Sequence, residues 1–209
     1  GAPTAARRRL EFVGDSITAC TNLRRPAGDP AFGIPQAPSC ADGGLFSDFA
    51  LSYQHQLCGA LGANCSTVAW GGKGMYVNCC DEGETMPGYF KQTLGWGGAG
   101  SAWGFGASGF VPDGVVINLG TNDFSGCHKY SKDGCGAAFQ ARFTATYLQF
   151  MQNVTRWYDK PDIQFFAGVG PITVDYWNAT AAAVTQARAL GLKATLVDMQ
   201  ACAKGGGSC

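Results

Sequence analysis

The sequence predicts an α/β domain in which helices cover both faces of a central, five-stranded parallel sheet. Strand-like and helix-like segments alternate along the chain, and this alternation is typical of parallel sheets joined by crossover helices. The length of 209 residues suits one domain with a complete core. No internal repeat or linker divides the chain. We therefore expect residues 1–209 to form a single three-layer α/β/α sandwich.

Five segments are predicted strands because each is a short run of apolar or β-branched residues. The first contains Leu10, Phe12 and Val13 and leads directly into a glycine. The third is continuously apolar, as expected for a strand that is buried on both faces. The predicted strands are residues 9–13, 66–70, 115–119, 163–169 and 194–197.

Three segments are predicted helices. Apolar residues recur at helical spacing in residues 46–61. Residues 137–158 and 179–190 are also predicted helices, and 137–158 is the longest of the three. Residues 21–44 are rich in Pro, Gly and Asp and are predicted to form a long loop. Residues 71–113 contain Gly, Trp and Phe without a clear period, which predicts a long functional loop region or one that carries short helices.

The charge and composition of the chain argue against several classes of protein. Fifteen basic residues balance fifteen acidic ones, so no nucleic acid is expected as a partner. No apolar run approaches the length of a membrane span, and the N-terminus does not read as a secretory signal. Cys and His do not occur at spacings typical of zinc sites, so no metal site is expected.

Ten cysteines favour disulfides and an oxidising compartment. Glycosylation sequons begin at Asn64, Asn153 and Asn178, and with the cysteines they indicate a secreted protein that can carry N-linked glycans. Loop lengths suggest three disulfides, although connectivity does not follow from sequence: Cys58–Cys65, Cys127–Cys135 and Cys202–Cys209. Cys20, Cys40, Cys79 and Cys80 remain, and the adjacent Cys79 and Cys80 are expected to bond to different partners rather than to each other.

Three glycine-containing motifs follow three of the predicted strands. They are Gly14-Asp15-Ser16, Trp70-Gly71-Gly72-Lys73-Gly74 and Gly120-Thr121-Asn122-Asp123. Because the carboxyl ends of parallel strands meet at one edge of a sheet, these motifs should converge. A serine can attack a carbonyl carbon, and a glycine amide and an asparagine side chain can donate hydrogen bonds to the oxyanion that forms. The three motifs together therefore predict an acyl-transfer site.

At these residues the sequence resembles the SGNH (GDSL-type) hydrolase superfamily, and it is most similar to the carbohydrate esterases of family 2. The resemblance also covers residues 8–18, 72–76, 112–124 and 168–171. It implies a flavodoxin-like sheet, with Ser16 as nucleophile and its own N–H, the Gly72 N–H and the Asn122 side chain as the oxyanion hole. It further implies an acetylated carbohydrate as substrate, an acetyl-serine intermediate, and no metal or organic cofactor.

The same resemblance implies a His-Pro block after the last strand, and the sequence reaches Cys209 without one. We therefore expect the domain to lack its C-terminal histidine-bearing segment, which would lie on residues beyond Cys209 or on a separate piece. The sequence holds two histidines. His55 is expected on a helix surface, and His128, in a predicted loop, is a weak candidate for a replacement base. A catalytically inactive SGNH fold with a glycan-binding or structural role is the alternative.

Some residues near the motifs have other expected roles. Asp15 and Asp123 are expected to order their loops by hydrogen bonding rather than to act in catalysis. Aromatic side chains can stack on sugar rings, and the candidates for that role are Trp96, Trp103, Tyr176 and Trp177.

Overall fold

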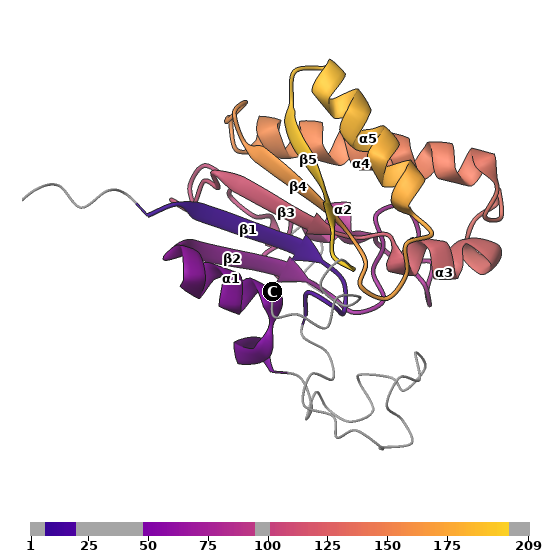
Figure 1. Ribbon diagram of the computed structural model, residues 1–209, viewed down its shortest axis with the longest axis horizontal. Coiled ribbons are helices and arrows are strands. Elements are labelled where there is room, and N and C mark those ends of the chain that lie inside the picture. Colours follow the sequence, from indigo (N-terminus) through magenta and orange to yellow (C-terminus); the bar gives the residue numbers. More distant parts are fainter. Residues whose placement is uncertain (1–6, 20–47, 95–100, 201–209) are drawn as a thin grey trace, which may run out of the picture.

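A five-stranded parallel sheet forms the centre of the protein, as predicted. The computed structural model describes residues 7–19, 48–94 and 101–200. The strand order is β2-β1-β3-β4-β5, and each neighbouring pair is parallel. The strands are β1 (Arg9–Gly14), β2 (Asn64–Ala69), β3 (Gly114–Asn118), β4 (Gln164–Val169) and β5 (Lys193–Asp198). Figure 1 shows their carboxyl ends pointing the same way.

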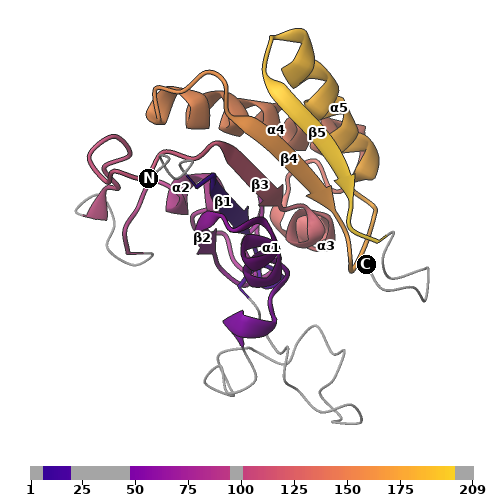
Figure 2. The same cartoon turned by 60° about the vertical axis from the view of Figure 1, so that its left-hand side comes forward.

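Helices cover both faces of this sheet, which confirms the three-layer prediction. Helix α1 lies on one face, and α4 and α5 lie on the other (Figures 1 and 2). Alternate side chains of β1 accordingly meet different layers: Phe12 contacts the ring of Tyr53, and Glu11 accepts a hydrogen bond from Tyr158. The helical elements are the 3₁₀ turn η1 (Phe49–Leu51), α1 (Tyr53–Leu61), α2 (Met86–Tyr89), α3 (Thr121–Tyr130), α4 (Ala137–Trp157) and α5 (Trp177–Ala189).

The main core lies between the sheet and α4. The buried residues of α4 recur every three or four positions, so one stripe of the helix faces the sheet. They are Phe139, Phe143, Thr144, Tyr147, Phe150, Met151 and Val154. Phe90, which caps the short α2, packs edge-on against Phe150 at a ring separation of 5.2 Å. The long segment between β2 and β3 therefore contributes to the core, and its short helix agrees with the prediction for residues 71–113.

Two helical segments differ from the prediction. The segment expected as one helix over 46–61 is divided, within its described part, at Ser52, whose hydroxyl accepts from the His55 N–H and caps α1. Helix α3 occupies residues that the sequence favoured as loop. Asn, Asp, Ser and Gly are weak helix formers, so α3 depends on packing: Cys127 is fully buried, and Gly126 lies against the loop at Asn78.

Disulfides join three pairs of described cysteines. Cys58–Cys65 and Cys127–Cys135 confirm two predicted pairs. The expectation that adjacent cysteines reach different partners was wrong, because Cys79 and Cys80 are bonded to each other. The predicted Cys202–Cys209 pair, together with Cys20 and Cys40, lies outside the described residues.

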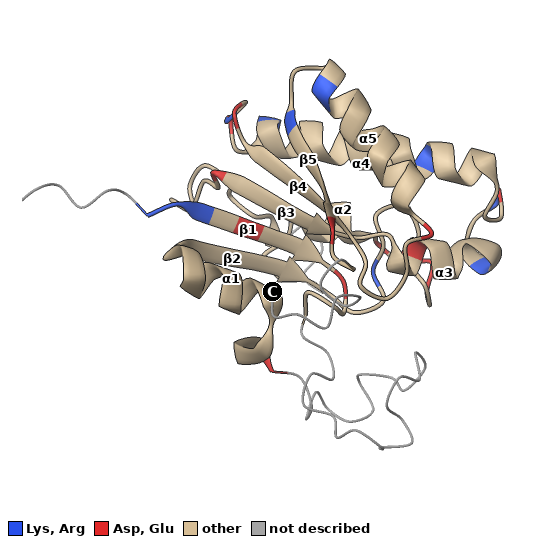
Figure 3. Cartoon of the chain, in the orientation of Figure 1, with Lys and Arg blue, Asp and Glu red and all other residues tan. Residues whose placement is uncertain are grey.

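Neither a metal site nor a membrane-spanning helix is found in the described part of the chain. The ligand atoms of Cys127, His128 and Cys135 lie within 4.8 Å of one another. Their two sulfur atoms are joined in a disulfide, so they offer no thiolate to a metal. Of the helices in residues 7–19, 48–94 and 101–200, none is both long and apolar enough to cross a bilayer. Acidic and basic residues are interspersed over the elements (Figure 3).

Candidate active site

The three sequence motifs follow β1, β2 and β3, which lie side by side in the order β2-β1-β3, with β2 at the edge of the sheet. Ser16 lies in the turn after β1, Gly72 in the loop after β2, and Asn122 at the second residue of α3, after β3. The structure therefore places all three predicted site residues on segments that leave the same edge of the sheet. This is the edge at which open α/β sheets bind their ligands.

Ser16 is held in a tight turn that the side chain of Asp15 shapes. Asp15 Oδ1 accepts from the Ile17 N–H at 2.9 Å, and the Asp15 carbonyl accepts from the Ala19 N–H at 2.8 Å. Gly14 permits the turn, because a Cβ on that residue would lie 2.0 Å from the Thr18 hydroxyl oxygen. Asp15 is buried and Ser16 is half-buried. These hydrogen bonds confirm the expectation that Asp15 orders the turn.

Asn122 connects the other two motifs. Its side-chain Nδ2 donates to the Lys73 carbonyl at 2.9 Å and to Asp15 Oδ2 at 3.2 Å. Lys73 is the residue after Gly72, and Asp15 is the residue before Ser16. One buried amide group, 8% exposed, therefore joins the nucleophile turn to the glycine loop. Both of its hydrogens have acceptors in this arrangement.

The loop that carries Gly72 is held from two sides. Gly72 has φ of +80°, a left-handed conformation that favours glycine, and its carbonyl accepts from the Cys79 N–H at 3.1 Å. The Asp123 carboxylate accepts from three successive N–H groups, those of residues 75–77, at 2.6–3.0 Å. Asp123 therefore orders the loop, as predicted, and fixes it to the start of α3.

Burial raises the pKa values of both carboxyl groups at this edge. The pKa of Asp15 rises from 3.8 to about 7, mainly through desolvation, and the charge of Asp123 adds to the rise. Burial raises the pKa of Asp123 to about 6, although hydrogen bonds from the N–H groups of residues 75–77 and from its own N–H oppose the effect. The cation of Lys73 points to Asp81 at 3.0 Å and lies over the ring of Tyr89. Because the pKa of Asp15 lies at about 7, its carboxyl group, beside Ser16, is partly protonated near neutral pH.

Both histidines are exposed. His55, on α1 as predicted, packs its ring against Phe49. The prediction that His128 lies in a loop was wrong, because it lies on α3. It follows Asn122 by six residues, which corresponds to a rise of about 9 Å along a helix.

The predicted sugar-stacking residues are only partly placed where they could meet a ligand. Tyr176 is fully buried and its hydroxyl accepts from the Gly170 N–H, so that prediction was wrong. Trp103 and Trp177 are half-buried, and Trp96 lies outside the described residues. An aromatic residue that the sequence interpretation missed is Trp70, which is 39% exposed and stacks on Tyr89 at 5.4 Å. The sequence signal for Trp70 as a candidate sugar-stacking residue was its position immediately before Gly71-Gly72.

Among curated proteins, the chain is similar to the cellulase/esterase CelE of Acetivibrio thermocellus, with 31% identity over 172 residues. The match covers 82% of this chain and 18% of that protein. The acetylxylan esterase/glucomannan deacetylase of Cellvibrio japonicus is 26% identical over 155 residues, which are 73% of this chain and 37% of that protein. No family model matches the sequence.

Solved structures show the same relationship. A family two carbohydrate esterase from Clostridium thermocellum, in complex with cellohexaose, is 27% identical with a TM-score of 0.71. The match covers 95% of this chain and 55% of that one. A family 2 enzyme from Corynascus thermopiles, solved with a carbohydrate binding domain, is 30% identical with a TM-score of 0.69, over 94% of this chain and 58% of that one. The chain spans less than two fifths of these curated relatives, and little more than half of these solved chains.

Proposed function

We propose that this chain, which resembles the family 2 carbohydrate esterases in sequence and in its SGNH-type fold, removes O-acetyl groups from carbohydrate with Ser16 as nucleophile. The observation that carries the proposal is the position of Asn122. Its amide bonds to the neighbours of both Ser16 and Gly72, which supports a site in which the proposed nucleophile and the proposed oxyanion donors are connected. The relatives named as carbohydrate or acetylxylan esterases support the choice of ester and substrate.

In the proposed reaction the Ser16 Oγ attacks the acetyl carbonyl carbon and gives its proton to a general base. The carbonyl oxygen becomes an oxyanion, which accepts from the N–H groups of Ser16 and Gly72 and from the Asn122 amide. The C–O bond to the sugar then breaks, and the sugar hydroxyl leaves with the proton. Water attacks the acetyl-serine in the same way and releases acetate. Each oxyanion donor of this kind typically contributes about 3–4 kcal/mol to transition-state stability.

The contacts of Asn122 define what it must do in this step. Because both of its hydrogens already have acceptors, it can stabilise an oxyanion only by sharing one of them. The hydrogen bond to Asp15, at 3.2 Å, is the longer of the two, and it is therefore the one we propose is shared. The shorter bond to the Lys73 carbonyl keeps the amide in place.

We also propose that the protein works in an oxidising, extracellular compartment. The three disulfides among the described residues support this. Of the three sequons, Asn64 and Asn178 are exposed, whereas Asn153 is half-buried and accepts a hydrogen bond from Gln149 at 2.9 Å. Asn64 and Asn178 are therefore the better candidates for N-linked glycans.

The test is release of acetate from acetylated xylan and from an aryl acetate by the wild-type protein, Ser16→Ala and Asn122→Ala. One series contains imidazole, which supplies a base in solution. We expect Ser16→Ala to abolish release and Asn122→Ala to lower kcat by about a hundredfold or more with little change in KM. If no release depends on Ser16 in either series, the proposal is wrong. Binding of xylan without turnover would instead support the inactive, glycan-binding alternative.

A further inference from the structure

We propose that the disulfide between Cys79 and Cys80 is a positioning element of the oxyanion hole, which sets the place of Gly72 relative to Asn122. The inference rests on the proposed function, because it concerns how the two proposed oxyanion donors, Gly72 and Asn122, are positioned. The disulfide itself does not touch the substrate in this proposal. Two adjacent cysteines joined by a disulfide close a small covalent ring that includes the peptide bond between them. The Cα atoms are 3.8 Å apart, which is the spacing across a trans peptide.

Cys79 bonds to Gly72 through its backbone, and its sulfur lies beside the same residue. Its N–H donates to the Gly72 carbonyl at 3.1 Å, and its Sγ lies 3.5 Å from the position that a Cβ on Gly72 would occupy. The hydrogen bond fixes the peptide that follows Gly72, and the sulfur borders the space that a side chain of this residue would occupy. Because only the two backbone torsions of Gly72 separate its N–H from this fixed peptide, the direction of the N–H depends on where Cys79 is held.

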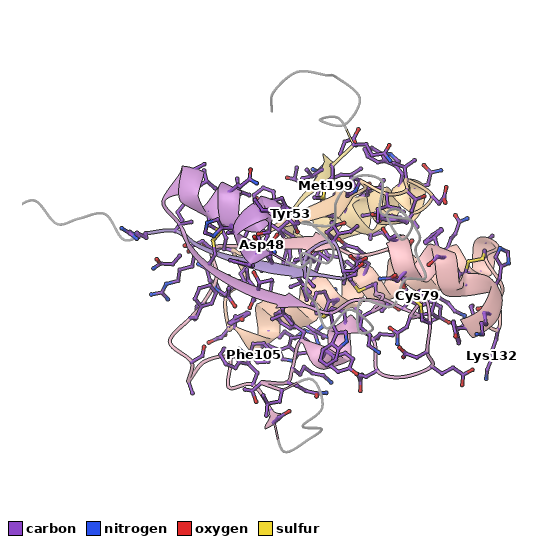
Figure 4. All side chains as sticks on the ribbon, turned by 90° about the horizontal axis from the view of Figure 1, so that it is seen from below. Asp48, Tyr53, Cys79, Phe105, Lys132 and Met199 are labelled. Atoms are coloured by element: carbon purple, nitrogen blue, oxygen red, sulfur yellow. A yellow bond between two sulfur atoms is a disulfide. The ribbon has the colours of Figure 1, made fainter. Side chains whose placement is uncertain are left out.

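Cys79 also contacts the helix that carries Asn122. A Cβ on Gly126 of α3 would lie 2.9 Å from the Cys79 Cα and 2.2 Å from the Asn78 carbonyl oxygen, so the helix and the loop meet backbone to backbone. Figure 4 labels Cys79, beside the ribbon of α3. Cys79 therefore stands between Gly72 on one side and α3 on the other, and its placement sets the separation between the two proposed oxyanion donors.

The disulfide restricts the backbone rotations of Cys79, because it bonds Cys79 to the very next residue, Cys80. Cys80 is exposed, while Cys79 is half-buried between the two glycines. A thiol reductant can therefore attack the Cys80 Sγ, which forms a mixed disulfide and releases the Cys79 thiolate. A second thiol of the reductant then displaces Cys80, so that two electrons and two protons convert the disulfide into two thiols while the reductant is oxidised. The freed backbone at residues 79 and 80 regains rotations that the ring had removed.

The experiment compares Cys79→Ser/Cys80→Ser with the wild-type protein, and uses Cys58→Ser/Cys65→Ser as the matched control. The control removes a disulfide that joins α1 to the start of β2, whereas the loop of Gly72 follows the end of β2. We expect the first variant to lower kcat of Ser16-dependent acetate release about ten- to a hundredfold, with KM within about twofold. The control should retain the wild-type kcat. Reduction of the wild-type protein should reproduce the loss, and reoxidation should restore it.

Several outcomes would overturn the inference. An unchanged kcat in Cys79→Ser/Cys80→Ser would do so, as would an equal loss in the control, which would point to general destabilisation. Kinetics are measured at a temperature at which both variants are fully folded by circular dichroism.

A second readout separates this inference from the proposed function. Hydrogen exchange of the residue 79 amide, which bonds to Gly72, should accelerate at least tenfold in the variant without the disulfide. If the wild-type protein has no Ser16-dependent turnover, the proposed function fails, and this exchange still tests the positioning. Unchanged exchange protection would refute the positioning whatever the activity.

Discussion

Glu11 lies in the middle of β1 with its carboxyl group buried, and replacing it with glutamine should stabilise the protein above neutral pH. The side chain is 2% exposed, and Glu11 Oε2 accepts a hydrogen bond from the Tyr158 hydroxyl at 2.8 Å. The Ser66 side chain also bonds to the carboxyl group. Glutamine has the same shape and keeps an oxygen that can accept from Tyr158. The substitution therefore removes the charge while leaving the packing in place.

The magnitude follows from the pKa. Desolvation raises the pKa of Glu11 from 4.5 to about 7, and the two side-chain hydrogen bonds only partly oppose it. Because the folded state holds this proton more tightly than the unfolded state, the contribution to stability is complete below pH 4.5. It is lost as the pH rises to about 7. One pKa unit corresponds to about 1.4 kcal/mol, so the ionised group costs about 3 kcal/mol above that pH.

The assay is urea denaturation of wild type and Glu11→Gln at pH 4.5 and at pH 8. Glu11→Gln should match the wild type at the lower pH, where most of the penalty is absent, and exceed its free energy of unfolding by about 3 kcal/mol at the higher pH. Asp15 and Asp123 titrate in the same range, so the difference between the two proteins isolates Glu11. Glu82→Gln, at an exposed glutamate, is the control and should show no such difference. A difference independent of pH would refute the reasoning.

Two further substitutions test how the loops are held. Gly14→Ala should lower the free energy of unfolding by about 1–3 kcal/mol and reduce activity, because the new Cβ would overlap the Thr18 hydroxyl; an unchanged melting curve would contradict this. Asp123→Ala leaves the N–H groups of residues 75–77 without their acceptor. It should cost about 3 kcal/mol in urea denaturation and lower kcat, and retention of wild-type kcat would show that the loop does not need this anchor.

The strands and the long helices were predictable because their signals are local. The apolar run of β3 and the stripe of large side chains on α4 indicate which surfaces are buried. The alternation of strands and helices along the chain then limits the possible sheet topologies. Helix α3 was not predictable in the same way. Its sequence is rich in poor helix formers, and what stabilises it is contact with the distant loop at Asn78 and the burial of Cys127.

At the site, convergence of the three motifs followed from parallel topology alone. The finer contacts did not, because they join residues far apart in the sequence. Asn122 meets Asp15 across 107 positions and Lys73 across 49. The Cys79–Cys80 bond was missed for a related reason. The partner of Cys79 depends on where the fold places this residue, which is between Gly72 and α3, and the sequence does not show that placement.

The central claim is that Ser16 carries the acetyl group during turnover, and peptide mass mapping tests it most directly. The protein is mixed with an aryl acetate, quenched in acid within a single turnover and digested. We predict one added acetyl group on the peptide that contains Ser16, which is absent from Ser16→Ala and lost with time as acetate is released. Acetate release at the wild-type rate by Ser16→Ala, with no acetyl group on the Ser16 peptide of the wild type, would contradict the claim.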